Sequence, residues 1–184
     1  MSDEDVSIYT PNTDEGDDED DVRSDREPIA VGIAEYALTD RRRPLSTSGL
    51  GSCVAVAVHD ADAGVSGLLH FMLPQATESK GRHDAEAKFA DTGIESLLAE
   101  FEEYGGEPSR SWAKLAGGAS MIEFSRSERS IGERNAAAAT ATLTDRGVSI
   151  VGTDFGGHSG RSVVFSPETG ELIVKSASGE ENRL

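Results

Sequence analysis

Short runs of alternating apolar and polar residues, or of consecutive small apolar residues, recur along this chain. Alternation over residues 29–38 ("IAVGIAEYAL") predicts a β-strand, because side chains two positions apart share one face of a strand. Residues 52–58 and 65–73 are almost entirely apolar, which is typical of strands buried on both faces. Further strands are predicted at residues 112–119 (running into a glycine turn), 148–155, 161–166 and 171–176.

Two segments have the spacing of helices instead. Residues 84–104 repeat large apolar side chains every three or four positions, and the Ala-rich residues 132–147 end in a glycine. The order along the chain is therefore three strands, a helix, a strand, a helix and three strands. Strands in clusters favour an α+β fold of layered mixed sheets with two main helices over a doubly wound parallel sheet.

Charge divides the chain into segments. The first 28 residues hold twelve Asp or Glu against two Arg, and their run "DEGDDEDD" has no apolar side chain to bury. Ordering such a segment would cost entropy without compensation, so residues 1–28 are expected to be a disordered acidic tail. The folded domain is expected to span residues 29–176, followed by a flexible C-terminal tail over residues 177–184.

The composition narrows the classes of partner and compartment. The net charge of −17 would repel nucleic-acid phosphates, which argues against nucleic acid as a partner. Four Lys against thirteen Arg, with strong acidity, suggest adaptation to a very salty cytoplasm. A single cysteine cannot form an internal disulfide. The acidic N-terminus has no signal pattern, and no apolar run is long enough to insert into a membrane, so a cytoplasmic protein is expected.

That single cysteine, Cys53, lies in the stretch "TSGLGSCVAVAVHD" at the start of a predicted strand. If the turn "HDADAG" closes the following hairpin symmetrically, opposite residues have numbers that sum to 123, which places Cys53 directly across from His70. An imidazole at that position could take the thiol proton and stabilise the thiolate as an ion pair. A slip of one residue would separate the two side chains onto opposite faces.

Glycines before the cysteine allow a tight bend in the backbone. Gly51 and Ser52 are candidates for an oxyanion-binding loop, in which the N–H groups of Ser52 and Cys53 point at a developing negative charge. A third group usually orients the base, and spacing alone does not choose among the nearby hydroxyls of Ser46, Thr47, Ser48 and Ser52. The alternative is that Cys53 is an inert thiol buried beside "VAVAV".

Six motifs extend this local pattern over roughly residues 29–175. In chain order they are "TSGLGSCVAV", "LLHFMLP", "KFADTGIESLL", "AKLAGGASM", "IGERNA" and "DFGGHSGR". Together they resemble the chemoreceptor glutamine deamidases of the CheD family. The resemblance implies that Cys53 is the nucleophile, that His70 is the general base and that Thr47 orients the imidazole.

The same resemblance implies a reaction and a fold. The reaction would be hydrolysis of glutamine side-chain amides to glutamate on methyl-accepting chemoreceptors, through a Cys thioester, in chemotaxis adaptation. The fold would be similar to that of deamidating toxins that use a cysteine. No metal or organic cofactor would be needed, and the sequence contains no metal-ligand motif such as H-E-x-x-H.

The family also associates with the CheC phosphatase, which suggests a second hypothesis. In it the chain is a chemotaxis adaptor that binds receptors and CheC, with catalysis secondary. A thiol hydrolase with another substrate is a third hypothesis. Within "DFGGHSGR", Gly157 and Arg161 are candidates for contact with a substrate or partner, and a structural turn with an ion-paired Arg161 is the alternative.

Overall fold

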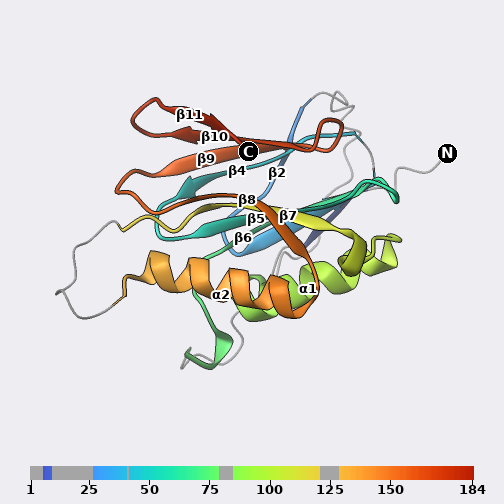
Figure 1. Cartoon of the computed structure of the whole chain (residues 1–184), viewed down its shortest axis with the longest axis horizontal. Helices are drawn as coiled ribbons and strands as arrows, with labels where there is room; N and C mark the ends of the chain where they lie inside the picture. The colour runs from blue at the N-terminus through green and yellow to red at the C-terminus, as the bar shows by residue number, and fades with distance from the viewer. Residues whose placement is uncertain (1–5, 10–26, 41, 79–84, 121–128) are drawn as a thin grey trace, which may run out of the picture.

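The molecule has three layers: a small sheet, a larger sheet and a pair of helices (Figure 1). Figure 1 draws the computed structural model, which describes residues 6–9, 27–40, 42–78, 85–120 and 129–184. Within these residues two α-helices lie side by side on the outer face of the larger sheet, and both sheets contain parallel and antiparallel pairs. The α+β class with two main helices and mixed sheets is therefore confirmed.

The larger sheet has six strands and the smaller sheet has five. The larger sheet runs β1 (Val6–Tyr9), β3 (Glu35–Thr39), β6 (Val65–Phe71), β5 (Val54–Asp60), β7 (Trp112–Gly117) and β8 (Ser149–Phe155). The smaller sheet runs β11 (Glu181–Arg183), β10 (Glu171–Ser176), β9 (Arg161–Ser166), β4 (Leu45–Leu50) and β2 (Ile29–Ala30).

Two features of these sheets differ from the sequence prediction. The predicted strand over residues 29–38 divides into β2 and β3, because Ala34 adopts a left-handed φ of 61° and turns the chain from one sheet into the other. Strand β4 was not predicted at all. Its sequence "LSTSGL" lacks alternation, and β4 forms because it pairs with β9 on one side and with β2 on the other.

The two helices are α1 (Ala90–Glu103) and α2 (Ile131–Asp145). Helix α1 begins later than residue 84 because residues 86–88 form a 3₁₀ turn and Phe89 is extended, bridging to Leu73. Helix α2 begins with a capping box, in which the Ser130 hydroxyl accepts from the Glu133 N–H and the Glu133 carboxylate accepts from the Ser130 N–H. None of the helices among the described residues is long and apolar enough to cross a membrane.

Strand β5 contributes to two cores, since all seven of its residues are buried. Val54, Val56 and Val58 belong to the cluster that packs against the helices. Ala55 and Ala57 belong to a second cluster between the two sheets, and Cys53 packs against that cluster. The small side chains on the second face let the sheets approach closely, and they place Cys53 in the layer between the sheets.

The hairpin of β5 and β6 has a different register from the one predicted. Asp60 pairs with Val65 and Ala55 pairs with His70, so opposite residues have numbers that sum to 125. The partner of Cys53 in this register would be Met72, and His70 lies two residues away from that position. Because side chains alternate with a period of two, a shift of two residues leaves Cys53 and His70 on the same face. The predicted direct pairing is wrong, and the predicted common face is retained.

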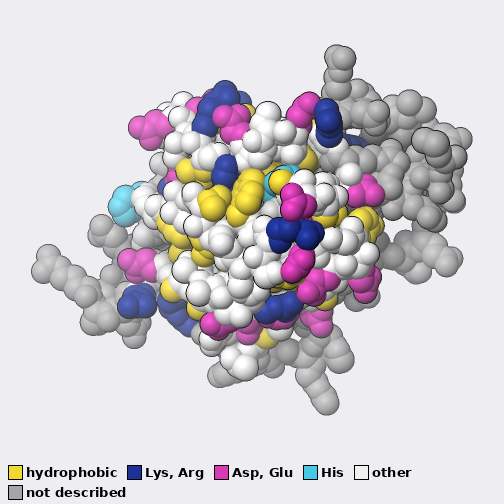
Figure 2. Space-filling model, turned by 45° about the vertical axis from the view of Figure 1, so that its right-hand side comes forward, with side chains coloured by type: hydrophobic (Ala, Val, Ile, Leu, Met, Phe, Trp, Pro, Cys, Tyr) yellow, Lys and Arg dark blue, Asp and Glu magenta, His cyan; other side chains and the backbone are white. Residues whose placement is uncertain are grey.

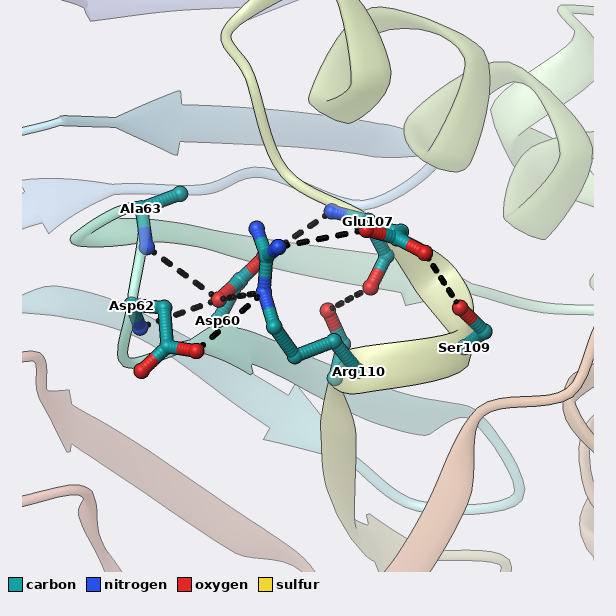
Figure 3. Close-up of polar contacts among 7 residues, drawn as sticks. Asp60, Asp62, Ala63, Glu107, Ser109 and Arg110 are labelled. Atoms are coloured by element: carbon teal, nitrogen blue, oxygen red, sulfur yellow. Dashed lines mark hydrogen bonds and ion pairs between the residues drawn. The ribbon is translucent and has the colours of Figure 1, made fainter.

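The turn explains this register (Figure 3). Residues 61–64 form a four-residue loop that ends at Gly64, where φ is 71°. The buried Asp60 carboxylate accepts the N–H groups of Asp62 (3.0 Å), Ala63 (3.2 Å) and Glu107 (2.9 Å), and it accepts the Arg110 guanidinium at 2.6 Å. Chiefly through the hydrogen bonds from Arg110, the pKa of Asp60 is lowered to about 2.

Both terminal segments, which were expected to lie outside the folded domain, contain residues that pair with a sheet. Most of residues 1–28, the expected acidic tail, lies outside the described residues. Its described part includes β1, which pairs antiparallel with β3. Residues 177–184 include β11, which pairs with β10, and the Leu184 N–H donates to the Leu172 carbonyl at 3.0 Å. These hydrogen bonds join the C-terminal residues to the smaller sheet, and the expected domain limits stay a prediction.

Candidate active site

Cys53 lies in the short connection between β4 and β5, which belong to different sheets. Near the end of β4 the chain bends at Gly49, whose φ of 77° is left-handed and is disfavoured for other residues. Gly51 then donates its N–H to the Gly49 carbonyl at 3.1 Å. This bend carries the chain across the layer between the sheets and leaves Cys53 half-buried, one residue before β5 begins.

His70 lies near the end of β6, and its side chain is fully buried. It is on the face of the larger sheet that packs against the smaller sheet, the same face as Ala55 and Cys53. The Nε2 atom of His70 is buried and has no hydrogen-bond partner. An unpartnered buried nitrogen costs stability, and such atoms concentrate where a protein performs chemistry.

Thr47 comes from β4 in the opposite sheet and meets His70 between the layers. Its Oγ1 lies 2.7 Å from His70 Nδ1 and 2.7 Å from the Val31 carbonyl. A carbonyl can only accept, so the single hydroxyl proton goes to Val31 and the hydroxyl must accept from His70. The proton of neutral His70 is therefore on Nδ1, and Nε2 carries a free lone pair.

Burial controls the protonation of both reactive side chains. Desolvation lowers the pKa of His70 to about 4, because the charged imidazolium would lose its hydration. Desolvation also raises the pKa of the Cys53 thiol, partly offset by the backbone N–H of Cys53 itself. Both shifts favour the neutral thiol and the neutral imidazole over the ion pair expected from the sequence. A neutral imidazole is the form of His70 that can accept a proton.

Glycines bring β7 and α2 against the segment that carries Cys53. Gly117 has a φ of 120°, and a Cβ at this position would lie 2.2 Å from the Cys53 carbonyl oxygen. Gly118 donates its N–H to that same carbonyl at 2.8 Å. A Cβ on Gly132, in the first turn of α2, would lie 2.4 Å from the Gly118 carbonyl oxygen. Larger side chains at these three positions would push the helix and strand away from the site.

One turn further along α2, Asn135 reaches the site and was missed by the sequence analysis. Its side chain is fully buried, and its Nδ2 donates to the Ser52 carbonyl at 2.8 Å and to the Met72 carbonyl at 2.7 Å. The signal in the sequence was the motif "IGERNA", which supported the family resemblance without giving its asparagine a role.

The oxyanion-loop candidates lie directly beside Cys53. The Gly51 carbonyl accepts a hydrogen bond from the Ala119 N–H (2.8 Å), and the Gly51 N–H donates to the Gly49 carbonyl. The loop is thus hydrogen-bonded to the segment that follows β7. Of the candidate donors, the Cys53 N–H favours the ionised sulfur, because its hydrogen bond lowers the thiol pKa and partly offsets desolvation.

Arg161 and Gly157 lie beside this loop rather than at the thiol. Arg161 pairs with Leu50 at the end of β4, and its guanidinium donates to Asp154 at 2.9 Å with the side chain 11% exposed. Gly157 has a φ of 69° and accepts the Ser120 N–H at 2.9 Å. Both residues line an open polar cavity of about 730 Å³. The ion pair agrees with the structural alternative for Arg161, and contact with a substrate stays a prediction.

Metal ligands do not gather at this site. Over the described ranges of the chain, no three His, Cys, Asp or Glu side chains are arranged to hold a metal ion. The groups that the structure does place on one face of the larger sheet are the Cys53 thiol and the His70 imidazole, whose tautomer the Thr47 hydroxyl sets.

Comparison with known proteins identifies the family. The model of the family described as CheD chemotactic sensory transduction matches residues 72–176. A probable chemoreceptor glutamine deamidase CheD of Haloarcula marismortui is 46% identical over 162 residues, which cover 88% of this chain and 92% of that protein. The chemoreceptor glutamine deamidase CheD of Thermotoga maritima is 41% identical over 151 residues, which cover 82% of this chain and 93% of that protein.

Two solved structures are distant likenesses of this chain. The hypothetical protein YfiH of Bacillus licheniformis superposes with a TM-score of 0.43 at 13% identity, covering 66% of this chain and 54% of that one. The C-terminal domain of CNFy from Yersinia pseudotuberculosis gives a TM-score of 0.33 at 15% identity, covering 82% of this chain and 53% of that one. The family rests instead on the sequence matches, which extend over most of the chain at 40% identity and above: this chain belongs to the CheD family.

Proposed function

We propose that this protein hydrolyses glutamine side-chain amides on methyl-accepting chemoreceptors to glutamate, with Cys53 as nucleophile and His70 as base. The observation that carries the proposal is the Thr47 hydroxyl, which accepts from His70 Nδ1 and leaves Nε2 as an unpartnered lone pair on the face of Cys53. The relatives whose printed names are chemoreceptor glutamine deamidase support the choice of substrate.

The first half of the reaction forms a thioester. Cys53 Sγ attacks the amide carbon of the glutamine side chain while His70 Nε2 takes the thiol proton. The amide oxygen gains the negative charge, which backbone N–H groups at Cys53 would stabilise. When the tetrahedral intermediate collapses, the carbon–nitrogen bond breaks and His70 returns the proton to the nitrogen, which leaves as ammonia. His70 is neutral again.

The second half consumes one water molecule. His70 Nε2 takes a proton from the water as its oxygen attacks the thioester carbon, and collapse breaks the carbon–sulfur bond. The proton on His70 passes to the departing sulfur, which restores the thiol, and the product is glutamate. The raised thiol pKa favours this regeneration, because a thiol of high pKa holds its proton.

The test measures Gln→Glu conversion on a receptor. The cytoplasmic domain of a chemoreceptor from Haloarcula marismortui is incubated with the protein in molar KCl, and converted sites are mapped by mass spectrometry. Cys53→Ala should abolish conversion, and Thr47→Val should lower kcat by about 10- to 100-fold because the imidazole loses its orientation. Thr47→Ser keeps the hydroxyl and is the matched control. Equal conversion by wild type and Cys53→Ala would refute the catalytic role of the thiol.

A further inference from the structure

Asn135 occupies the point where the pairing between β5 and β6 stops. The outermost pair of that ladder is Val54 with Phe71. In the same register Cys53 would pair with Met72, but the Met72 N–H donates instead to the Lys88 carbonyl at 2.9 Å. The next backbone pair of the ladder, which would include Cys53, is therefore absent.

The Asn135 amide spans this gap. Its Nδ2 donates one hydrogen bond to the Ser52 carbonyl (2.8 Å) and one to the Met72 carbonyl (2.7 Å). Ser52 is bonded directly to Cys53, and Met72 is two residues beyond His70. One side chain on α2 thus joins the backbone beside the nucleophile to the backbone of the strand that carries the base.

The orientation of this amide is unambiguous. Both of its partners are carbonyl oxygens, which cannot donate, so the NH₂ group must face them and both of its protons are used. The Oδ1 atom then points the other way, where it is buried and has no hydrogen-bond partner. An unsatisfied buried acceptor costs stability. The fold therefore keeps the two hydrogen bonds from Nδ2 although the position of Oδ1 is unfavourable.

We propose that Asn135 is a positioning residue that sets the separation between the Cys53 thiol and the His70 imidazole. This inference rests on the proposed function for its kinetic consequence. Asn135 acts through the backbone and touches neither reacting atom. Without it, the segment of residues 51–53 loses its connection to Met72, so its hydrogen bonds from Gly118 and Ala119 should open more often.

The first test needs no substrate. In Asn135→Ala, the amide protons of Gly118 and Ala119, which bond the carbonyls of Cys53 and Gly51, should exchange at least about 10-fold faster than in wild type. The matched control is Leu143→Ala, also fully buried on α2 but packed in the core between helices and sheet. Exchange at Gly118 and Ala119 that is unchanged, or raised only as much as in Leu143→Ala, overturns the inference.

The second test uses the receptor assay. Asn135→Ala should lower kcat by about 10- to 100-fold with KM nearly unchanged, since misplacement of reacting groups affects the chemical step. The deficit should shrink as the pH approaches the thiol pKa, because a thiol that ionises by itself needs the base less. Leu143→Ala should show neither effect. If Asn135→Ala does not fold, Asn135→Ser, which keeps one donor, takes its place in both tests.

The two tests separate failure of this inference from failure of the proposed function. A kcat deficit that is constant with pH, or no larger than that of Leu143→Ala, refutes the positioning role while wild type remains an active deamidase. Wild type that converts no glutamine refutes the proposed function, and the exchange measurement still decides whether Asn135 holds the Cys53 segment to β6.

Discussion

A single hydroxyl proton decides the chemistry that is available to His70. Thr47 must give that proton to Val31, so it accepts from His70 Nδ1 and leaves Nε2 free. The same burial that creates this geometry keeps the imidazole neutral, since the charged form would be desolvated. Position and environment together thus keep the imidazole neutral with Nε2 free.

The low pKa of His70 predicts that activity is lost on the acid side at a pH well below the usual pKa of histidine. Only neutral imidazole can take the thiol proton, so kcat/KM for receptor conversion should fall with a midpoint near the free-enzyme pKa of about 4 rather than near 6.5. The measurement is the rate of Gln→Glu conversion between pH 3.5 and 8 at fixed KCl. A midpoint at about 6.5 would contradict the burial argument.

The pH dependence of folding stability is the control for that pH profile of activity. The folded pKa lies below the unfolded one, so between about pH 6.5 and 4 the unfolded chain binds a proton that the folded chain does not. Stability therefore falls as the pH decreases through this window, by at most about 3 kcal/mol from this group. Denaturant unfolding of wild type and His70→Gln should show that difference, which separates loss of fold from loss of the base.

At the scale of elements, the site depends on one hairpin and its turn. Strands β5 and β6 carry Cys53 and His70 to one end of the sheet, and the turn at the opposite end sets how the strands align. Asp60 holds this turn together by accepting backbone N–H groups and the Arg110 guanidinium (Figure 3). The turn at the far end of the strands thus contributes to the alignment of Cys53 and His70, together with the backbone pairs of the ladder.

Replacement of Asp60 should affect stability far more than catalysis. Asp60→Asn loses a buried charge-assisted contact, so the free energy of unfolding at pH 7 should fall by on the order of 2 kcal/mol. Because the folded pKa is depressed, this contribution is present above about pH 4 and is lost as the pH falls towards 2. Denaturant titrations at pH 7 and pH 3 measure the difference between wild type and variant.

Asp62→Asn is the matched control for that turn. The Asp62 side chain is 77% exposed and its oxygen lies 3.7 Å from Arg110, so its loss should change stability by less than about 0.5 kcal/mol. Below the melting temperature, kcat of Asp60→Asn should stay near the wild-type value, because the remaining ladder pairs hold the register. Equal destabilisation by the two variants would refute the role given to Asp60.

At the scale of the whole molecule, the net charge of −17 opposes compaction. Figure 2 shows acidic and basic side chains interspersed on one face, with hydrophobic side chains gathered near its centre. Within this mixed surface, ion pairs such as Arg183 with Glu171 and Glu181 are largely exposed and contribute little individually. Repulsion summed over the molecule therefore has to be screened by the solvent.

Salt should accordingly stabilise the protein. Raising KCl from 0.1 to 2 M shortens the Debye length from about 10 Å to less than about 3 Å, so the melting temperature should rise by several degrees, roughly 5 to 10 °C. Thermal unfolding followed by circular dichroism measures the shift. Sucrose at matched water activity is the control, because it stabilises without screening charge. A melting temperature that is independent of KCl would refute the role of self-repulsion.

The sequence by itself was sufficient to predict most of the helices and strands. Apolar spacing located seven strand segments, the first of which divides into β2 and β3, and both helices, since burial of one face imposes a period of two on a strand and of 3.6 on a helix. It did not locate β4, because the hydroxyl and glycine residues of "LSTSGL" have no such period. Thr47, which lies on that strand, was singled out among four nearby hydroxyls only by family resemblance.

What the sequence by itself determined is the common face on which Cys53 and His70 lie, because side-chain alternation survives a shift of two residues. The tertiary structure decided the register itself, since the hydrogen bonds of Asp60 in the turn are not a periodic property. It also decided the tautomer of His70 and the contacts of Asn135. Those depend on distances between segments far apart in the chain, which no local pattern of residues encodes.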